Sequence, residues 1–228
     1  LTVFDLQSTS TSTTPPADSG GGGGGGNYAP TYSNVDIEKA IQYLTAKQQD
    51  GDFSSALFTD WAAMAFGAYN RSNPTSVAIK NYLITDPSPT AGFNSVSDYA
   101  RRAMALMALE INPYQTKTNY IKKITDTFNG TELVDKPENQ GLFNDDIFAL
   151  IALRKAGYSE QDEIINKIIA FILSKQTNSN WGSVDLTAAA IQALKPFSSD
   201  SAVSKAIIDA TLYLKNEQQA DGGFANNS

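Results

Sequence analysis

The 228-residue sequence contains neither cysteine nor histidine. These two absences exclude a disulfide, a thiolate nucleophile, a zinc site built from Cys and His, and a histidine general base. A chain without free thiols is also compatible with an oxidising environment. We therefore expect no metal site of these kinds, and an extracellular or cell-surface location.

Positive charge is also scarce, because 17 Lys and Arg stand against 24 Asp and Glu, for a net charge of -7 and a pI near 4.6. Proteins that bind phosphate-rich partners need clustered Lys and Arg. No uninterrupted apolar run approaches the roughly 18 residues that a membrane span requires. We therefore expect no nucleic-acid partner and no insertion into a membrane.

The sequence does contain a repeated pattern, in which an amphipathic helix ends, a polar turn carries a glycine and an aromatic residue, and an apolar helix follows. The aromatic residues of the five copies are Phe53, Phe93, Phe143, Trp181 and Phe224, spaced by 40, 50, 38 and 43 residues. The turn glycines are Gly51, Gly92, Gly141, Gly182 and Gly223. A period of this length predicts an array of helical hairpins.

The helices of each hairpin differ in kind. The first is amphipathic, as Ile37, Ile41 and Leu44 show by their helical spacing, whereas the second is apolar nearly all round and has to be buried. The sequence predicts five outer helices near residues 35–49, 74–84, 115–128, 159–175 and 201–219. It predicts four inner helices near residues 60–70, 98–110, 145–156 and 185–196. Two concentric layers of this kind predict an all-α fold, an α/α toroid or an open arc of one.

Aspartate or threonine residues stand near the start of every inner helix: Thr59 or Asp60, Asp98, Asp145 or Asp146, and Asp185. We expect them to act as N-caps or first-turn residues, contributing about 1 kcal/mol each. The alternative is that they line one rim of the toroid and contact a ligand. Arg101 and Arg102 are unusual in an apolar helix. We expect a solvated helix edge for them, and the alternatives are that one of them reaches the central cavity or pairs with an Asp of the neighbouring turn.

Composition divides the chain into two parts. Residues 1–34 are rich in Ser, Thr and Pro and include seven consecutive glycines at 20–26, which is typical of a flexible tether. A disordered tail without a special role is the alternative. Residues 1–6 alternate like a strand, which is compatible with the last strand of an upstream β domain. We expect residues 35–228 to form the helical domain, incomplete at its C-terminus, with apolar surface left uncovered near Phe224.

The five repeated turns carry a family resemblance, as the last two show. Residues 218–224 read Gln-Gln-Ala-Asp-Gly-Gly-Phe, and Gln176 is followed by Trp-Gly-Ser-Val-Asp at residues 181–185. These strings resemble the repeat of the prenyltransferase and terpene (squalene) cyclase superfamily, in particular bacterial surface-protein versions that follow a Gly-rich tether. The resemblance implies an α/α toroid from residue 35 onward. It also implies that the turn aromatics wedge consecutive hairpins together.

The chemistries of that superfamily can be tested on these residues. A prenyltransferase zinc site cannot form without Cys and His, and the Cys of a thioester domain is absent. The Asp-x-Asp-Asp acid of class II cyclases has no match, because residues 50–53 read only Asp-Gly-Asp-Phe. The Asp-Asp-x-x-Asp motif of class I synthases is also missing. We therefore expect no catalytic residue in this sequence.

Three functions follow from the resemblance. The first is a non-catalytic module that binds a corrinoid such as cobalamin, or another small hydrophobic molecule, as the cobalamin carriers of this fold do. The second is a structural or adhesive module that contacts another surface protein. The third is a terpene-cyclase-like enzyme whose acid lies outside this sequence. The candidate ligand-binding residues are Asp60, Trp61, Asp98, Tyr99, Arg102, Asp146 and Asp185.

Overall fold

The computed structural model describes residues 36–224, and within this range every regular element is a helix. The α-helices are α1 Ile37–Thr45, α2 Ala56–Tyr69, α3 Pro74–Thr85, α4 Val96–Ala108, α5 Tyr120–Thr125, α6 Asn144–Lys155, α7 Glu163–Ser174, α8 Val184–Leu194 and α9 Ser201–Glu217. Two short 3-10 helices are η1 Pro137–Asn139 and η2 Lys195–Phe197. The all-α prediction is confirmed for this range. The predicted tether lies outside the described residues.

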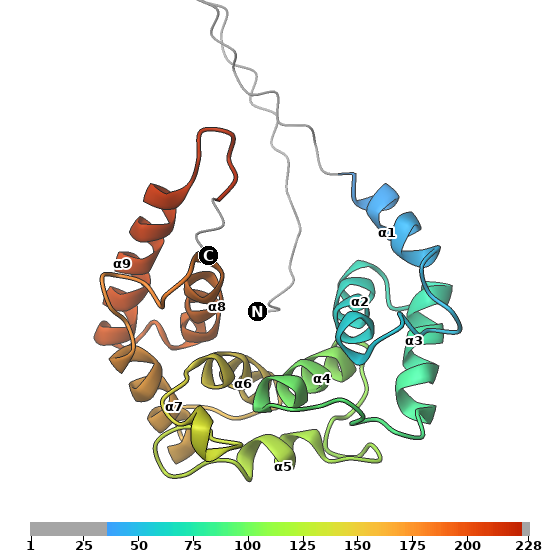
Figure 1. Ribbon diagram of the computed structural model, residues 1–228, viewed down its shortest axis with the longest axis horizontal. Coiled ribbons are helices and arrows are strands. Elements are labelled where there is room, and N and C mark those ends of the chain that lie inside the picture. Colours follow the sequence, from blue (N-terminus) through green and yellow to red (C-terminus); the bar gives the residue numbers. More distant parts are fainter. Residues whose placement is uncertain (1–35, 225–228) are drawn as a thin grey trace, which may run out of the picture.

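The helices follow an open curve in two layers (Figure 1). Helices α2, α4, α6 and α8 lie along its inside, and α2 packs on α4, α4 on α6, and α6 on α8. Helices α3, α5, α7 and α9 lie outside them, and α1 and α9 stand at the two separate ends. Inner and outer helices therefore alternate along the chain as their hydrophobic patterns predict.

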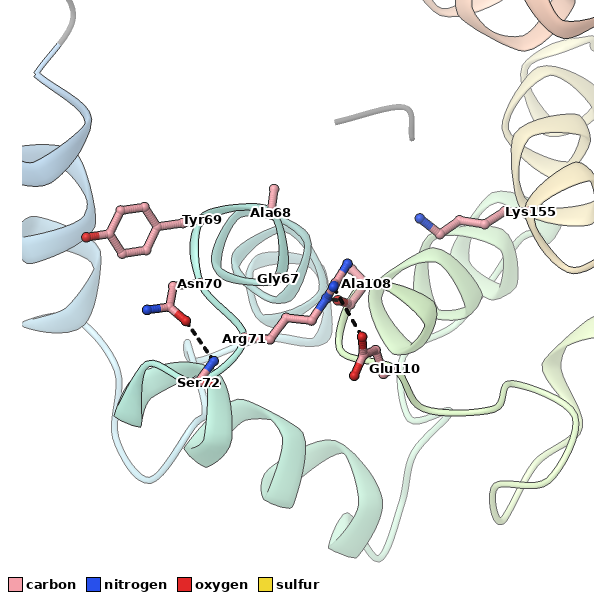
Figure 2. A pocket seen from close by; sticks show the side chains of 9 residues that line it. All are labelled: Gly67, Ala68, Tyr69, Asn70, Arg71, Ser72, Ala108, Glu110 and Lys155. Carbon is pink, nitrogen blue, oxygen red and sulfur yellow. Dashed lines mark hydrogen bonds and ion pairs between the residues drawn. The ribbon is translucent and has the colours of Figure 1, made fainter. Parts of the chain in front are cut away.

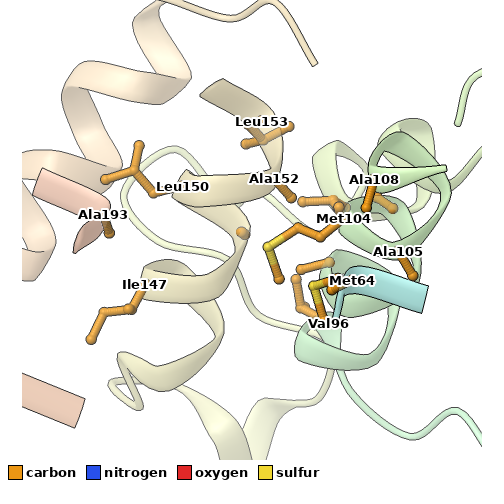
Figure 3. Close-up of a cluster of buried hydrophobic side chains, with 14 of the residues drawn as sticks. Met64, Val96, Met104, Ala105, Ala108, Ile147, Leu150, Ala152, Leu153 and Ala193 are labelled. Carbon is orange, nitrogen blue, oxygen red and sulfur yellow. The ribbon is translucent and has the colours of Figure 1, made fainter. Parts of the chain in front are cut away.

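The core lies between the inner helices and between them and the outer helices that pack on them. Figure 3 shows Met64 of α2, Met104 of α4 and Leu153 of α6 within one cluster of buried apolar side chains. Small residues let these helices approach closely, and a Cβ added to Gly67 would lie 2.6 Å from the Ala108 carbonyl oxygen. The crossing of α2 and α4 therefore requires glycine at position 67.

The inner helices begin at serines more often than at aspartates. Ser55, Ser95 and Ser183 are the N-caps of α2, α4 and α8, and each accepts a bond from a backbone N–H of the first turn. Asp98 completes a capping box with Ser95, as its predicted position allows. The expectation that Thr59 or Asp60 is an N-cap or first-turn residue is wrong, because α2 begins at Ala56 and both residues lie beyond its first turn.

The turn aromatics differ in their environments. Trp181 is fully buried, and its indole N–H donates to the Ile172 carbonyl of α7 at 2.8 Å. Phe93 packs on Tyr120 of α5 with ring centres 6.5 Å apart. Phe53 is buried and Phe143 packs partly buried on the core, whereas Phe224 is 46% exposed. Phe93 thus joins consecutive hairpins, and Trp181 fastens the two helices of its own hairpin.

Two buried threonines fix two of these turns. Thr59 Oγ1 accepts the backbone N–H of Phe53, and Thr187 Oγ1 accepts that of Trp181, both at 3.0 Å. Both threonines are fully buried. The same polar contact therefore orients the turn aromatic in the first and the fourth copies of the repeat.

Helix α9 and the turn after it leave apolar side chains in contact with solvent. Ile208, Leu212 and Phe224 are all exposed, so the uncovered apolar surface predicted near Phe224 is present. Between residues 36 and 224, no helix is both long enough and apolar enough to cross a membrane.

Replacement of turn glycines by alanine tests how closely the turns pack. Gly51 and Gly182 have φ angles of 89° and 87°, so alanine costs each about 1–2 kcal/mol in backbone strain. A Cβ at Gly51 would also lie 2.3 Å from the Ala78 carbonyl oxygen, whereas one at Gly182 meets nothing within 4 Å. In urea unfolding, Gly51→Ala should therefore lose about 1–3 kcal/mol more than Gly182→Ala. Equal losses would contradict close packing of the first turn on α3.

Candidate functional site

Asp60 of α2 lies fully buried between two arginines of α4. Arg102 Nε donates to Asp60 Oδ1, and Arg101 Nε donates to Asp60 Oδ2 at 3.2 Å. The expectation that these arginines lie on a solvated helix edge is wrong, because Arg102 is 1% exposed. The structure contains an ion pair with an aspartate, as one alternative had it, but Asp60 lies within α2 and not in the neighbouring turn.

Other groups complete this cluster around the arginines. Arg101 Nη1 pairs with Asp98 at 2.8 Å, and Arg102 Nη1 donates to the Pro89 carbonyl at 3.0 Å. Both guanidinium groups lie within 6 Å of the centre of the Phe93 ring, a cation–π distance. The cluster therefore ties α2, α4 and the turn before α4 together.

The charged groups of the cluster pair with one another, and the pKa values of Asp60 and Asp98 reflect both burial and this pairing. Burial raises the pKa of Asp60, and the charges of Arg102 and Arg101 oppose this rise. Burial also disfavours the charged form of Asp98, but the N–H of Asn94 and the Arg101 guanidinium outweigh it, so the pKa of Asp98 is lowered. The charges of this cluster are directed at one another, which favours a structural role.

The seven predicted ligand-binding residues do not lie together in one site. Asp60, Asp98 and Arg102 lie in one cluster, and Tyr99 is next to it, 5.4 Å from Phe93 between ring centres. Trp61 is exposed on α2, and Asp185 is exposed in the first turn of α8. Asp146 belongs to a second group of carboxylates.

That second group lies where residues 129–141 cover the start of α6. Asp146 is fully buried, and its Oδ1 accepts the Leu133 N–H at 3.0 Å. Its Oδ2 has no hydrogen-bond partner among the described residues. Glu132 is also buried and accepts the Gly141 N–H at 2.7 Å. Within residues 36–224, no three or more acidic side chains are grouped so that they could hold a metal ion.

Burial raises the pKa of Asp146 to about 7, and the nearby charges of Glu132 and Asp145 act in the same direction. Burial also raises the pKa of Asp145, although Ser97 donates its N–H and hydroxyl to that carboxylate. Asp146 is thus a neutral acid below about pH 7. Its unpartnered oxygen faces the protein interior, where an ionised carboxylate is costly.

A cavity of about 590 Å³ lies at the C-terminal ends of α2, α4 and α6 (Figure 2). Its lining consists of Gly67, Ala68, Tyr69, Asn70, Arg71, Ser72, Ala108, Glu110 and Lys155. Arg71 follows α2, Glu110 follows α4, and Lys155 is the last residue of α6. None of the seven predicted residues lines this cavity.

Arg71 is held in place by the end of α4. Its Nε donates to the Ala108 carbonyl at 3.0 Å, and its Nη1 pairs with Glu110 at 3.2 Å. The side chains of Arg71 and Glu110 are 49% and 67% exposed, so this ion pair contributes only about 0–1 kcal/mol. Burial lowers the pKa of Lys155, and the charge of Arg71 lowers it further. Two cations therefore influence each other across the cavity.

Comparisons with family models, with curated proteins and with solved structures found no significant match. The superfamily resemblance of the turns therefore stays a prediction. Function has to be argued from the chemistry of the site itself, since one helical fold can carry many activities.

Removal of one partner from the buried ion pair should be strongly destabilising. Arg102→Met leaves Asp60 buried with Arg101 as its remaining partner, and we expect a loss of about 3–5 kcal/mol in the free energy of unfolding. Asp60→Asn combined with Arg102→Met should recover part of this loss, because no excess charge stays buried. Arg71→Met is the control, since its exposed pair predicts a loss below about 1 kcal/mol. Equal losses for Arg102→Met and Arg71→Met in urea unfolding at pH 7 would contradict the assigned role.

The buried Asp146 predicts a pH dependence of stability. Its pKa is 3.8 ordinarily and about 7 in the folded protein, so above pH 3.8 the unfolded state loses this proton first. The contribution of Asp146 to stability should therefore be complete below about pH 4, fall as the pH rises to 7, and level off above. The total is on the order of 4 kcal/mol.

Asp146→Asn removes the titrating group, so its stability relative to the original protein should rise between pH 4 and 7. The control is Asp185→Asn, which removes an exposed carboxylate of α8. Urea unfolding at several pH values measures both differences. A pH-independent difference for Asp146→Asn would contradict the raised pKa.

Proposed function

We propose that the chain is a non-catalytic module that binds a small molecule in the cavity at the ends of α2, α4 and α6. The observation that carries this proposal is the cavity itself. Its volume of about 590 Å³ falls in the range of roughly 300–1,000 Å³ typical of ligand pockets. It also lies where three inner helices end, so elements far apart in the sequence position its lining.

The proposed scaffold is an α/α toroid, or an arc of one, of the prenyltransferase and terpene cyclase type. Support comes from the alternation of inner and outer helices and from the repeated turns (Figure 1). The resemblance to tethered surface proteins makes an extracellular location part of the proposal. A corrinoid is the candidate ligand that the carrier proteins of this fold suggest.

Binding is favoured over catalysis because the buried acids are engaged elsewhere. A cyclase-like mechanism needs a proton donor directed into the substrate cavity. The one carboxylate in the lining, Glu110, is exposed and paired with Arg71. Asp60 is bound by two arginines, and Asp146 is enclosed between α6 and residues 129–141.

A second candidate function is an interaction module. One face of α2 supports it, because Phe58 and Trp61 are 60% and 48% exposed and lie at helical spacing with the exposed Ala65. Exposed apolar patches of this kind often mark protein–protein contacts. In this alternative, another surface protein covers α2.

A thermal-shift screen tests the binding proposal. The ligands are a corrinoid, an isoprenoid diphosphate, a squalene-like polyene and small aromatic compounds. A ligand present at 100 times its Kd should add about 2.7 kcal/mol of stability. Ala68→Trp fills the cavity and should abolish this gain, whereas Ala65→Trp, one turn earlier and outside the lining, should retain it.

Stabilisation of both variants by the same ligand would place its binding outside the cavity. Absence of any stabilisation across the screen would reject the cavity as a site for these compounds. That result would favour the interaction module over the small-molecule-binding module. A product formed from the polyene or the diphosphate would overturn the non-catalytic assignment.

A further inference from the structure

The walls of the cavity carry two positive charges in a protein that is acidic overall. We propose that the cavity recognises a small organic anion, whose carboxylate or phosphate group lies between Arg71 and Lys155. This inference rests on the proposed function and adds the chemical class of the ligand. The three charged side chains of the lining sum to a positive charge, although the chain has a net charge of -7.

Arg71 is oriented for such a ligand before the ligand binds. The bond from its Nε to the Ala108 carbonyl fixes the guanidinium against the end of α4. Among the described residues, Nε and Nη1 have acceptors, and no bond from Nη2 is found. A guanidinium group held in this way can donate parallel hydrogen bonds to a carboxylate or a phosphate.

Lys155 provides the opposite wall. In Figure 2 its ammonium group points from the end of α6 toward the side of the cavity that carries Arg71. Burial lowers the pKa of Lys155, and repulsion by the Arg71 charge lowers it further. An anion between them would relieve this repulsion and favour the charged form of both groups.

The carboxylate of Glu110 competes with the proposed ligand anion for Arg71. Its carboxylate already occupies Nη1 of Arg71, but the pair is exposed and its separation of 3.2 Å is long for a charge-assisted bond. A ligand anion can therefore take the place of Glu110 at low energetic cost. The neighbouring lining residues Gly67 and Ala68 are small and uncharged, and they leave room for a neutral ligand body.

The test compares probes that share an aromatic body and differ in charge: benzoate, phenyl phosphate and benzyl alcohol. Each is titrated into the ¹⁵N-labelled protein, and the amide shifts of residues 67–72 and 108–110 give its affinity. The two anions should bind more tightly than benzyl alcohol by roughly tenfold or more, the effect of a charge-assisted hydrogen bond. Added salt should weaken the anions and leave the alcohol unchanged.

Variants then identify the groups responsible. Arg71→Gln and Lys155→Gln should each weaken benzoate by roughly tenfold, while Glu110→Gln should tighten it. The matched control is Lys205→Gln, an exposed lysine of α9 outside the lining, which should leave the affinity unchanged. Equal binding of benzoate and benzyl alcohol, or equal affinities of the Arg71 and Lys155 variants and the original protein, would overturn the anion proposal.

The variant Ala68→Trp distinguishes failure of the anion proposal from failure of the proposed small-molecule binding. Benzyl alcohol and benzoate could bind the original protein with equal affinity and both lose binding in Ala68→Trp. In that case the cavity binds ligands but has no preference for anions. If neither the probes nor the ligands of the thermal-shift screen shift residues 67–72, both proposals fail. Binding of the anions that survives Ala68→Trp would also overturn the anion proposal, because it would place them elsewhere.

Discussion

The ion pair between Asp60 and Arg102 sets the register of α2 against α4. Both groups are buried, so a shift of either helix would leave a charge without its partner, at a cost of several kcal/mol. With that register fixed, Gly67 meets Ala108 two turns further along, and the helices approach as closely as glycine allows. Arg71 then reaches the Ala108 carbonyl. One wall of the cavity thus depends on an ion pair near the opposite end of α2.

The inner helices have three levels along their length. Polar contacts lie between the first turn and the middle of these helices, where Ser97 of α4 donates to Asp145 of α6 and Arg102 of α4 donates to Asp60 of α2. Methionine, leucine and alanine fill the middle (Figure 3). The cavity lies at the last turns, where the small Gly67 and Ala68 come before Arg71. The first two levels hold the helices together, and the third contains the cavity.

The sequence was sufficient to predict the helices and their alternation, because the apolar spacing in α7 and the unbroken apolar run in α6 are local patterns. The ion pair of Arg102 was only an alternative from the sequence alone, since its partner Asp60 lies 42 residues away along the chain. Asp60 instead resembles an N-cap in sequence, a role that Ser55 takes. The cavity was missed for a similar reason. Arg71 and Lys155 stand where cations commonly complement a helix C-terminus, so their sequence positions suggest capping and not binding.

The chain has two tryptophans, in opposite environments. Trp181 is enclosed between α7 and α8 with its indole N–H bonded to a carbonyl, whereas Trp61 projects from the exposed face of α2. An indole in water emits at longer wavelength than one in an apolar interior, so the two emissions differ. The intrinsic fluorescence of this protein therefore carries two separate signals, one from the packing of the α7–α8 hairpin and one from whatever approaches α2.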